Sequence, residues 1–285
     1  MGSRRKLRGA PGFLSELSRT ATQPIGRRTR SLGATLALFA IAIALLAAFA
    51  AIERRSAAPL VPAGFVARRA VLVPNLLQLL LGVSAISTLF LLTLYTQQVL
   101  GYTPLQAGLA YMPLAAGVAS ATAVANRMVG RVGPRPLAAA GLAIAAAGMA
   151  RLGHAPVSAE YWTDVLPAMV VLGLGAGLSF VSITTAALTQ VDDAAAGLAS
   201  GLLSASVQIG GALGVAMLVG VVVAQRSSDL LQSGTTALAA QLGGLQLAFV
   251  LAAAVSLAAA LVALVTLARA KPGTLPATTV PEVAT

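Results

Sequence analysis

Residues 245–267 read LQLAFVLAAAVSLAAALVALVTL, and no side chain among them carries a charge. An α-helix rises about 1.5 Å per residue, so about 20 apolar residues cross the hydrocarbon core of a bilayer, which is about 30 Å thick. In lipid a helix also satisfies its own backbone hydrogen bonds. This run therefore predicts a membrane-spanning helix.

Six earlier runs share this apolar character. They cover residues 32–52, 71–95, 105–125, 136–152, 164–189 and 198–223. The run 136–152 is the weakest, because it is short and rich in alanine. No segment alternates apolar and polar residues as a β-strand would. We therefore predict an all-α integral membrane protein with about seven transmembrane helices.

The composition of the 285 residues supports this prediction, since 58% are hydrophobic and 9% are charged. A soluble domain carries about 25% charged residues, so a surface this poor in charge faces lipid. The chain has no cysteine and one histidine, His154, which excludes disulfides and any thiolate or multi-histidine metal site. We find no nucleophile motif, no phosphate-binding loop and no paired carboxylates at the membrane midplane, since the adjacent pair Asp192 and Asp193 lies in a loop. We therefore predict neither an enzyme nor a cofactor.

The basic residues predict the orientation in the membrane. Two of those next to the apolar runs, Arg151 and Arg226, lie on one side. Nine lie on the other, namely Arg54, Arg55, Arg68, Arg69, Arg127, Arg131, Arg135, Arg269 and Lys271. Basic loops remain in the cytoplasm, so we predict a multi-pass protein of the cell membrane with a cytoplasmic C-terminus. The net charge of +11 follows this pattern and does not indicate a nucleic-acid partner.

The N-terminal region departs from the pattern. Seven spans would place it outside, yet residues 1–31 hold eight Lys or Arg. Three explanations stay open: residues 32–52 do not cross the membrane, the chain lacks an upstream part, or a signal peptide is cleaved near residues 48–50. We favour the missing upstream part. We expect residues 1–31 to be a disordered basic leader and residues 269–285 to be a disordered tail.

Neutral polar side chains gather on three runs, 71–95, 164–189 and 198–223. At about 3.6 residues per turn they share one arc on each helix, and we expect them to face one substrate cavity. The candidates are Asn75, Gln78, Thr93, Gln97, Ser179, Ser182, Thr185 and Gln208. The alternative is that they join helices by hydrogen bonds worth about 0.6 kcal/mol each. We favour that alternative for Ser and Thr, and weigh the two evenly for the glutamines.

Small residues predict close packing between the spans. Gly173 with Gly177, and Gly210 with Gly214, have the four-residue spacing that allows tight helix crossings. Pro113 removes a backbone donor and is expected to bend its helix. We therefore predict that these five residues serve helix packing and bending.

Several motifs carry a resemblance to a known family. They are AIERRSAAPL at 51–60, YTQQVLGYTPLQAG at 95–108, RVGPR at 131–135, ASG at 199–201 and QIGGALG at 208–214. In this order they resemble the C-terminal half of a 14-helix drug:proton antiporter of the major facilitator superfamily, over about residues 32–268. The resemblance implies an extra transmembrane helix at 32–52, a cytoplasmic linker at 53–70 and a six-helix transporter domain at 71–268. It also implies two inverted three-helix repeats, whose first helices line the cavity.

The loop before residue 136 is similar to the superfamily motif Gly-x-x-x-Asp-Arg-x-Gly-x-Arg/Lys, which latches the cytoplasmic side. The resemblance makes it a conformational loop, with the candidates Arg127, Arg131, Gly133 and Arg135. Asn126 replaces the leading glycine and Gly130 replaces the aspartate. These two departures put the latch in doubt.

The resemblance implies proton-coupled, multidrug-type efflux of small amphipathic substrates. The family usually carries its proton-coupling carboxylates in an N-terminal half, and the spans here contain no buried carboxylate, since Asp164 lies at a helix entrance. We therefore expect the chain to be incomplete without a separate N-terminal half or a second copy, with lipid and substrate as its other partners. The alternative is a non-transporting truncated membrane module or assembly partner.

Overall fold

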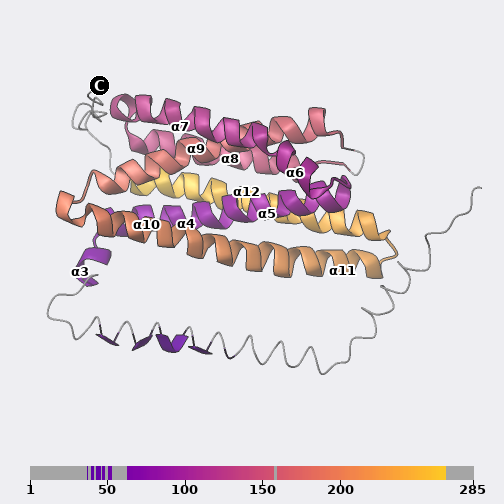
Figure 1. Ribbon diagram of the computed structural model, residues 1–285, viewed down its shortest axis with the longest axis horizontal. Helices are drawn as coiled ribbons and strands as arrows, with labels where there is room; N and C mark the ends of the chain where they lie inside the picture. Colours follow the sequence, from indigo (N-terminus) through magenta and orange to yellow (C-terminus); the bar gives the residue numbers. More distant parts are fainter. Residues whose placement is uncertain are drawn as a thin grey trace, which may run out of the picture. The chain divides into compact units, whose positions relative to one another are not determined.

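The computed structural model describes residues 63–156 and 159–267, together with ten helical positions between 37 and 52 (Figure 1). It divides the chain into two units, residues 1–62 and 63–285, and the boundary falls inside residues 53–70. The predicted leader 1–31 and tail 269–285 lie outside the described residues, as does most of the linker. The predicted helix 32–52 is described only in part, at positions that are helical.

The second unit is built from helices. They are α3 (Ala63–Val66), α4 (Arg69–Leu81), α5 (Ser87–Leu94), α6 (Pro104–Ala110), α7 (Met112–Val132), α8 (Pro134–Leu152), α9 (Leu166–Leu188), α10 (Asp193–Gly214), α11 (Ala224–Gln232) and α12 (Ala237–Thr266). Four π-helical segments, whose hydrogen bonds span one residue more than in an α-helix, continue or precede these helices. They are Gly82–Ile86, Tyr95–Val99, Tyr161–Val165 and Val215–Val223.

Five helices are long and apolar enough to cross a membrane. They are Arg69–Val99, Pro104–Val132, Tyr161–Leu188, Asp193–Gln232 and Ala237–Thr266. The described residues contain no β-strand, so the prediction of an all-α membrane fold is confirmed. The five fall short of the predicted seven because residues 32–52 are described only in part and α8 does not qualify. Arg135 and Arg151 lie at the two ends of this 19-residue helix and shorten its apolar part.

Three predicted spans are too short. The run 105–125 lies inside Pro104–Val132, and the run 198–223 lies inside a continuous helix of 40 residues, Asp193–Gln232. The helix that contains most of the run 245–267 begins eight residues before it, at Ala237. Arg226, predicted to lie in a loop, is on α11. Hydropathy falls where polar side chains reach the membrane surface, whereas the helical backbone continues beyond that point.

The helices run side by side along the long axis of the unit (Figure 1). α9 packs against α7 on one side and α8 on the other, α8 also packs against α12, and α4 packs against α10. α8 exposes only a narrow stripe, at residues 136, 140, 144, 147 and 151. Contact of α8 with lipid is therefore confined to that stripe, because the small residues of α8 let two neighbours approach closely.

Glycines mark the closest crossings. A side chain at Gly173 would collide with the carbonyl oxygen of Leu114 on α7, and one at Gly177 with that of Val118. On α10, side chains at Gly210 and Gly214 would strike backbone oxygens of the helix that begins as α4. Both predicted glycine pairs thus lie at helix crossings without room for a larger residue.

The predicted span 105–125 is interrupted near Pro113. α6 ends at Ala110, Tyr111 forms a turn, and α7 begins at Met112. Pro113 has no N–H to bond the carbonyl oxygen four residues earlier, so the helix has no continuous ladder at this point. The Tyr111 hydroxyl instead donates to the carbonyl oxygen of Leu89, 3.0 Å away, and ties the interruption to α5.

Candidate functional site

A cavity of about 390 Å³ lies where α4, α9 and α10 meet. α10 supplies five of the eight lining residues, at offsets 0, 3, 4, 7 and 8, which is one face of a helix. The lining residues are Gln78, Phe180, Thr184, Ser200, Leu203, Ser204, Val207 and Gln208. Gln78 comes from α4, and Phe180 and Thr184 come from adjacent turns of α9.

The cavity wall combines polar and apolar side chains and carries no charge. None of its eight residues is ionisable in the range where carboxylates and histidine titrate. Phe180 is 47% exposed and presents an aromatic ring beside the hydroxyls and amides. Such a wall binds by hydrogen bonding and apolar contact and has no group that transfers a proton.

Two polar atoms of this wall stand out among the described residues. Gln78 is 1% exposed, and its Oε1 has no hydrogen-bond partner. Thr184 Oγ1 is likewise buried without a partner. A buried polar atom left unpaired costs about 1–3 kcal/mol, so the site holds uncompensated hydrogen-bonding capacity on two facing helices.

Of the eight predicted cavity residues, Gln78 and Gln208 line this cavity and six do not. Asn75 and Thr93 link helices instead. Ser206 Oγ on α10 donates to Asn75 Oδ1 at 2.8 Å, and Asn75 Nδ2 donates to its own helix. Thr93 Oγ1 shares a hydrogen bond with the Tyr111 hydroxyl at 2.9 Å.

The two predicted serines of α9 are fully buried and bond their own helix. Ser179 Oγ donates to the carbonyl oxygen of Gly175 at 2.8 Å, and Ser182 Oγ donates to that of Leu178 at 2.7 Å. A side chain at Gly141 of α8 would collide with the Ser179 backbone, so this face of α9 packs on α8.

The last two predicted residues, Thr185 and Gln97, are half-buried and do not line the cavity. Phe180 and Thr184 were missed by sequence reasoning. Helix phase alone does not find them, because they follow Gly173 and Gly177 by seven residues each and so share the face of α9 that packs on α7. Only the helices that adjoin this part of α9 place the two residues at the cavity.

The predicted conformational loop joins α7 to α8. Arg127 and Arg131 are exposed on the last turns of α7, and Arg135 is half-buried in the first turn of α8. Gly133 joins the helices with a φ of 90°, which glycine adopts without a steric penalty. No acidic side chain among the described residues pairs with these arginines.

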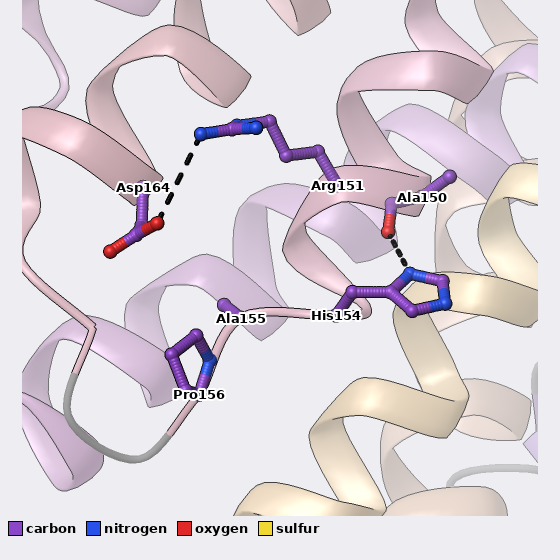
Figure 2. A pocket seen from close by; sticks show the side chains of 6 residues that line it. All are labelled: Ala150, Arg151, His154, Ala155, Pro156 and Asp164. Atoms are coloured by element: carbon purple, nitrogen blue, oxygen red, sulfur yellow. Dashed lines mark hydrogen bonds and ion pairs between the residues drawn. The ribbon is translucent and has the colours of Figure 1, made fainter.

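A second hollow, of about 410 Å³, lies at the opposite end of α8 (Figure 2). It is lined by Ala150, Arg151, His154, Ala155, Pro156 and Asp164. The His154 ring does not point toward the ion pair in Figure 2 but contacts the carbonyl oxygen of Ala150 through Nδ1, at 2.8 Å.

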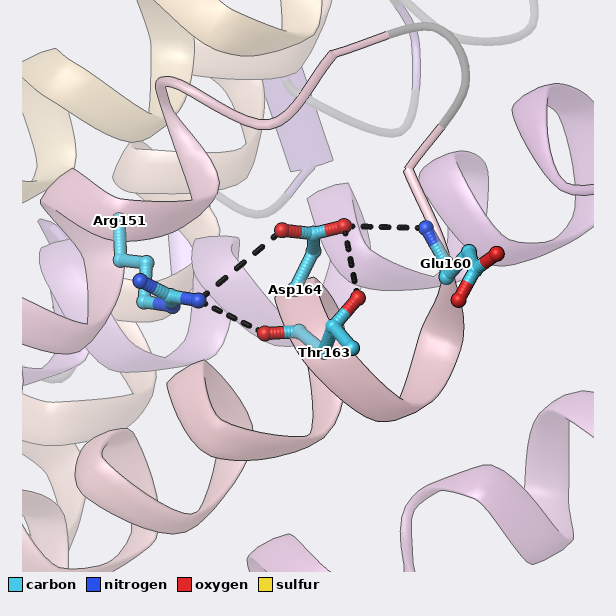
Figure 3. A network of polar contacts seen from close by, with 4 residues as sticks. All are labelled: Arg151, Glu160, Thr163 and Asp164. Carbon is cyan, nitrogen blue, oxygen red and sulfur yellow. Dashed lines mark hydrogen bonds and ion pairs between the residues drawn. The ribbon is translucent and has the colours of Figure 1, made fainter.

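Figure 3 shows how Arg151, in the last turn of α8, fastens that helix to the π-helical segment before α9. Its Nη2 donates to the carbonyl oxygen of Thr163 at 2.7 Å and lies 3.9 Å from Asp164 Oδ1. Asp164 Oδ2 accepts from the backbone N–H of Glu160 at 3.0 Å. Because Arg151 is 52% exposed, solvent screens the pair, and exposed pairs contribute at most about 1 kcal/mol. The cluster is a structural clip.

Comparison with known proteins is consistent with the fold. The sequence profile described as Major Facilitator Superfamily matches residues 34–215. The puromycin resistance protein pur8 of Streptomyces alboniger is 36% identical over 205 residues, which cover 70% of this chain and 40% of that protein. The lincomycin resistance protein of Streptomyces lincolnensis is 34% identical, over 61% of this chain and 36% of that protein. The cephamycin export protein CmcT of Amycolatopsis lactamdurans is 35% identical, over 62% and 37%.

Proposed function

This chain belongs to the Major Facilitator Superfamily, and we propose that it is the C-terminal domain of a proton-coupled exporter of small amphipathic drugs. The observation that carries the proposal is the cavity between α4, α9 and α10, a polar site inside a bundle of membrane-spanning helices. The names of the similar proteins, which include resistance to puromycin and export of cephamycin, support a drug as the cargo.

The orientation follows from the arginine-rich junction between α7 and α8. Basic loops favour the cytoplasm, so α4 begins, and α12 ends, at the cytoplasmic face. The cavity lies nearer that face, because Thr184 is within five residues of the end of α9. The proposed site is therefore reached from the cytoplasm.

We propose that a second six-helix half completes the transporter. The relatives named above are matched over 36–40% of their length. In transporters of this kind the substrate site lies between two halves that rock about it. A separate N-terminal half, or a second copy of this chain, would supply it.

The proton-coupling carboxylate is proposed to lie in that second half. The five acids among the described residues are Glu160, Asp164, Asp192, Asp193 and Asp229. All five lie at helix ends or in turns, whereas proton relays use acids inside the membrane.

Efflux of ethidium from a pump-deficient bacterium tests this function. The chain is expressed alone and together with the N-terminal half of a relative, and its insertion is checked with a tag. We expect efflux only with the partner half, and its loss when a protonophore collapses the proton gradient. Efflux by the chain alone points to a second copy as the partner. If neither case shows efflux although the protein is inserted, export is rejected and a non-transporting module is favoured.

A further inference from the structure

Apart from the Tyr95 hydroxyl, the other buried polar side chains of the same helices have hydrogen-bond partners, unlike the two unpartnered atoms of the cavity. Ser84, Ser87, Thr88 and Thr96, on the helix that begins as α4, each donate to a backbone oxygen three or four residues earlier. On α9, Ser179 and Ser182 do the same. Thr184 has such a carbonyl available at Phe180 but makes no bond to it.

The two atoms also belong to one place. Gln78 Oε1 comes from α4 and Thr184 Oγ1 from α9, and both residues line the same cavity. Buried polar atoms in native proteins are nearly always paired, with protein, water or a ligand. Two unpaired polar atoms from separate helices at one cavity indicate that a ligand enters the cavity and forms hydrogen bonds with them.

The geometry points to Gln78 and Thr184 as the specificity-determining residues of the proposed drug site, which take one N–H or O–H donor of the substrate. An amide oxygen accepts from such a donor, and a threonine hydroxyl both accepts and donates. Phe180, which is 47% exposed at the same wall, provides apolar contact for a substrate ring next to the donor. This inference rests on the function proposed above and adds the chemical feature that the site selects.

Charge plays no part in this selection. None of the eight lining residues is charged, so a cationic and a neutral substrate meet the same wall. A site built to hydrogen-bond a substrate group discriminates strongly against an analogue that lacks the group, because its buried polar atoms then stay unpaired. The expected preference is therefore for donors over alkylated analogues of the same ring system.

Two rhodamine dyes provide the test. Rhodamine 6G carries secondary amines with N–H donors, and tetramethylrhodamine ethyl ester has a similar cationic ring system with no N–H. The full chain is purified into lipid nanodiscs, and the Kd of each dye is measured by fluorescence anisotropy. We expect rhodamine 6G to bind about five- to tenfold more tightly, the effect of about one hydrogen bond.

Three variants assign the preference to its atoms. Gln78→Met removes the amide at nearly constant length, and Thr184→Val removes the hydroxyl at constant shape. Each substitution is expected to raise the Kd of rhodamine 6G about fivefold and to leave the Kd of the other dye unchanged. Gln98→Met, an exposed amide at the far end of the same helix, is the matched control and should change neither Kd.

The outcomes separate this inference from the proposed function. If the wild type binds both dyes equally, or if Gln78→Met and Thr184→Val weaken both dyes alike, the inference is wrong and the drug site stands. If the wild type binds neither dye, the inference fails, and the efflux assay with the partner half decides the proposed function separately. The elution profile of the purified protein reports whether Gln78→Met disturbs folding. If it does, Thr184→Val still decides the test.

Discussion

Single atoms at the glycine crossings limit how the helices pack. Gly210 has no room for a methyl group, because a Cβ there would collide with the carbonyl oxygen of Leu79. Gly201, on the same helix, has nothing within 4 Å of its Cβ position. The two glycines differ in surroundings alone, so they separate packing from helix propensity.

Gly210→Ala is therefore expected to destabilise the chain by about 1–3 kcal/mol, the usual effect of overpacking. Gly201→Ala is expected to be neutral or to stabilise by up to about 1 kcal/mol, because alanine favours the helix. The free energy of unfolding is measured by circular dichroism during an SDS titration. Equal effects of the two substitutions would show that the crossing is not tight.

Side-chain hydrogen bonds to α5 replace the missing backbone hydrogen bonds at the interruption between α6 and α7. The Tyr111 hydroxyl lies 2.9 Å from Thr93 Oγ1 and 3.0 Å from the carbonyl oxygen of Leu89. It therefore joins the α6–α7 turn to α5 at the point where Pro113 prevents a continuous helix.

Tyr111→Phe is expected to cost about 1 kcal/mol, the usual net value of such a bond. Tyr102→Phe is the control, since no side-chain hydrogen bond of Tyr102 is found among the described residues. The same SDS titration measures both variants. A Tyr111 variant as stable as the control would assign the interruption to Pro113 alone.

Hydropathy predicted that the spanning helices exist but not where they end or how they are rotated. The helix Asp193–Gln232 continues well beyond its apolar part, since backbone hydrogen bonds do not depend on side-chain polarity. Rotation is harder, because Ser179 and Thr184 have similar side chains in opposite roles. Ser179 bonds its own helix against α8, whereas Thr184 faces the cavity. Only the neighbours of each helix distinguish the two.

The unit as a whole is unevenly covered. The buried share of the most apolar stretch differs between the spanning helices. It is 22% for Pro104–Val132 and 28% for Asp193–Gln232, whereas it is 44–50% for the other three. The exposed face of α7 carries small residues, among them Ala115, Ala119 and Ala123, which suit close helix contact in a membrane. A second half is expected to cover this face.

Because the chain has no cysteine, a single one reports this contact. Ala119→Cys is expected to react several-fold more slowly with a maleimide when the N-terminal half of a relative is present, since that half excludes the reagent. Ala140→Cys, on the exposed stripe of α8, is the control and should react at the same rate in both cases. Labelling is followed by mass spectrometry in detergent. Unchanged labelling at Ala119 would place the partner elsewhere.

The uncharged wall of the cavity has an electrical consequence. Moving one elementary charge through 100 mV involves about 2.3 kcal/mol of work, and a wall without charges adds none of its own when the protein rearranges. In the exporter proposed above, this wall therefore adds no voltage sensitivity of its own to transport. A neutral drug and a cationic drug exported by the same protein would differ in that sensitivity by the charge of the drug.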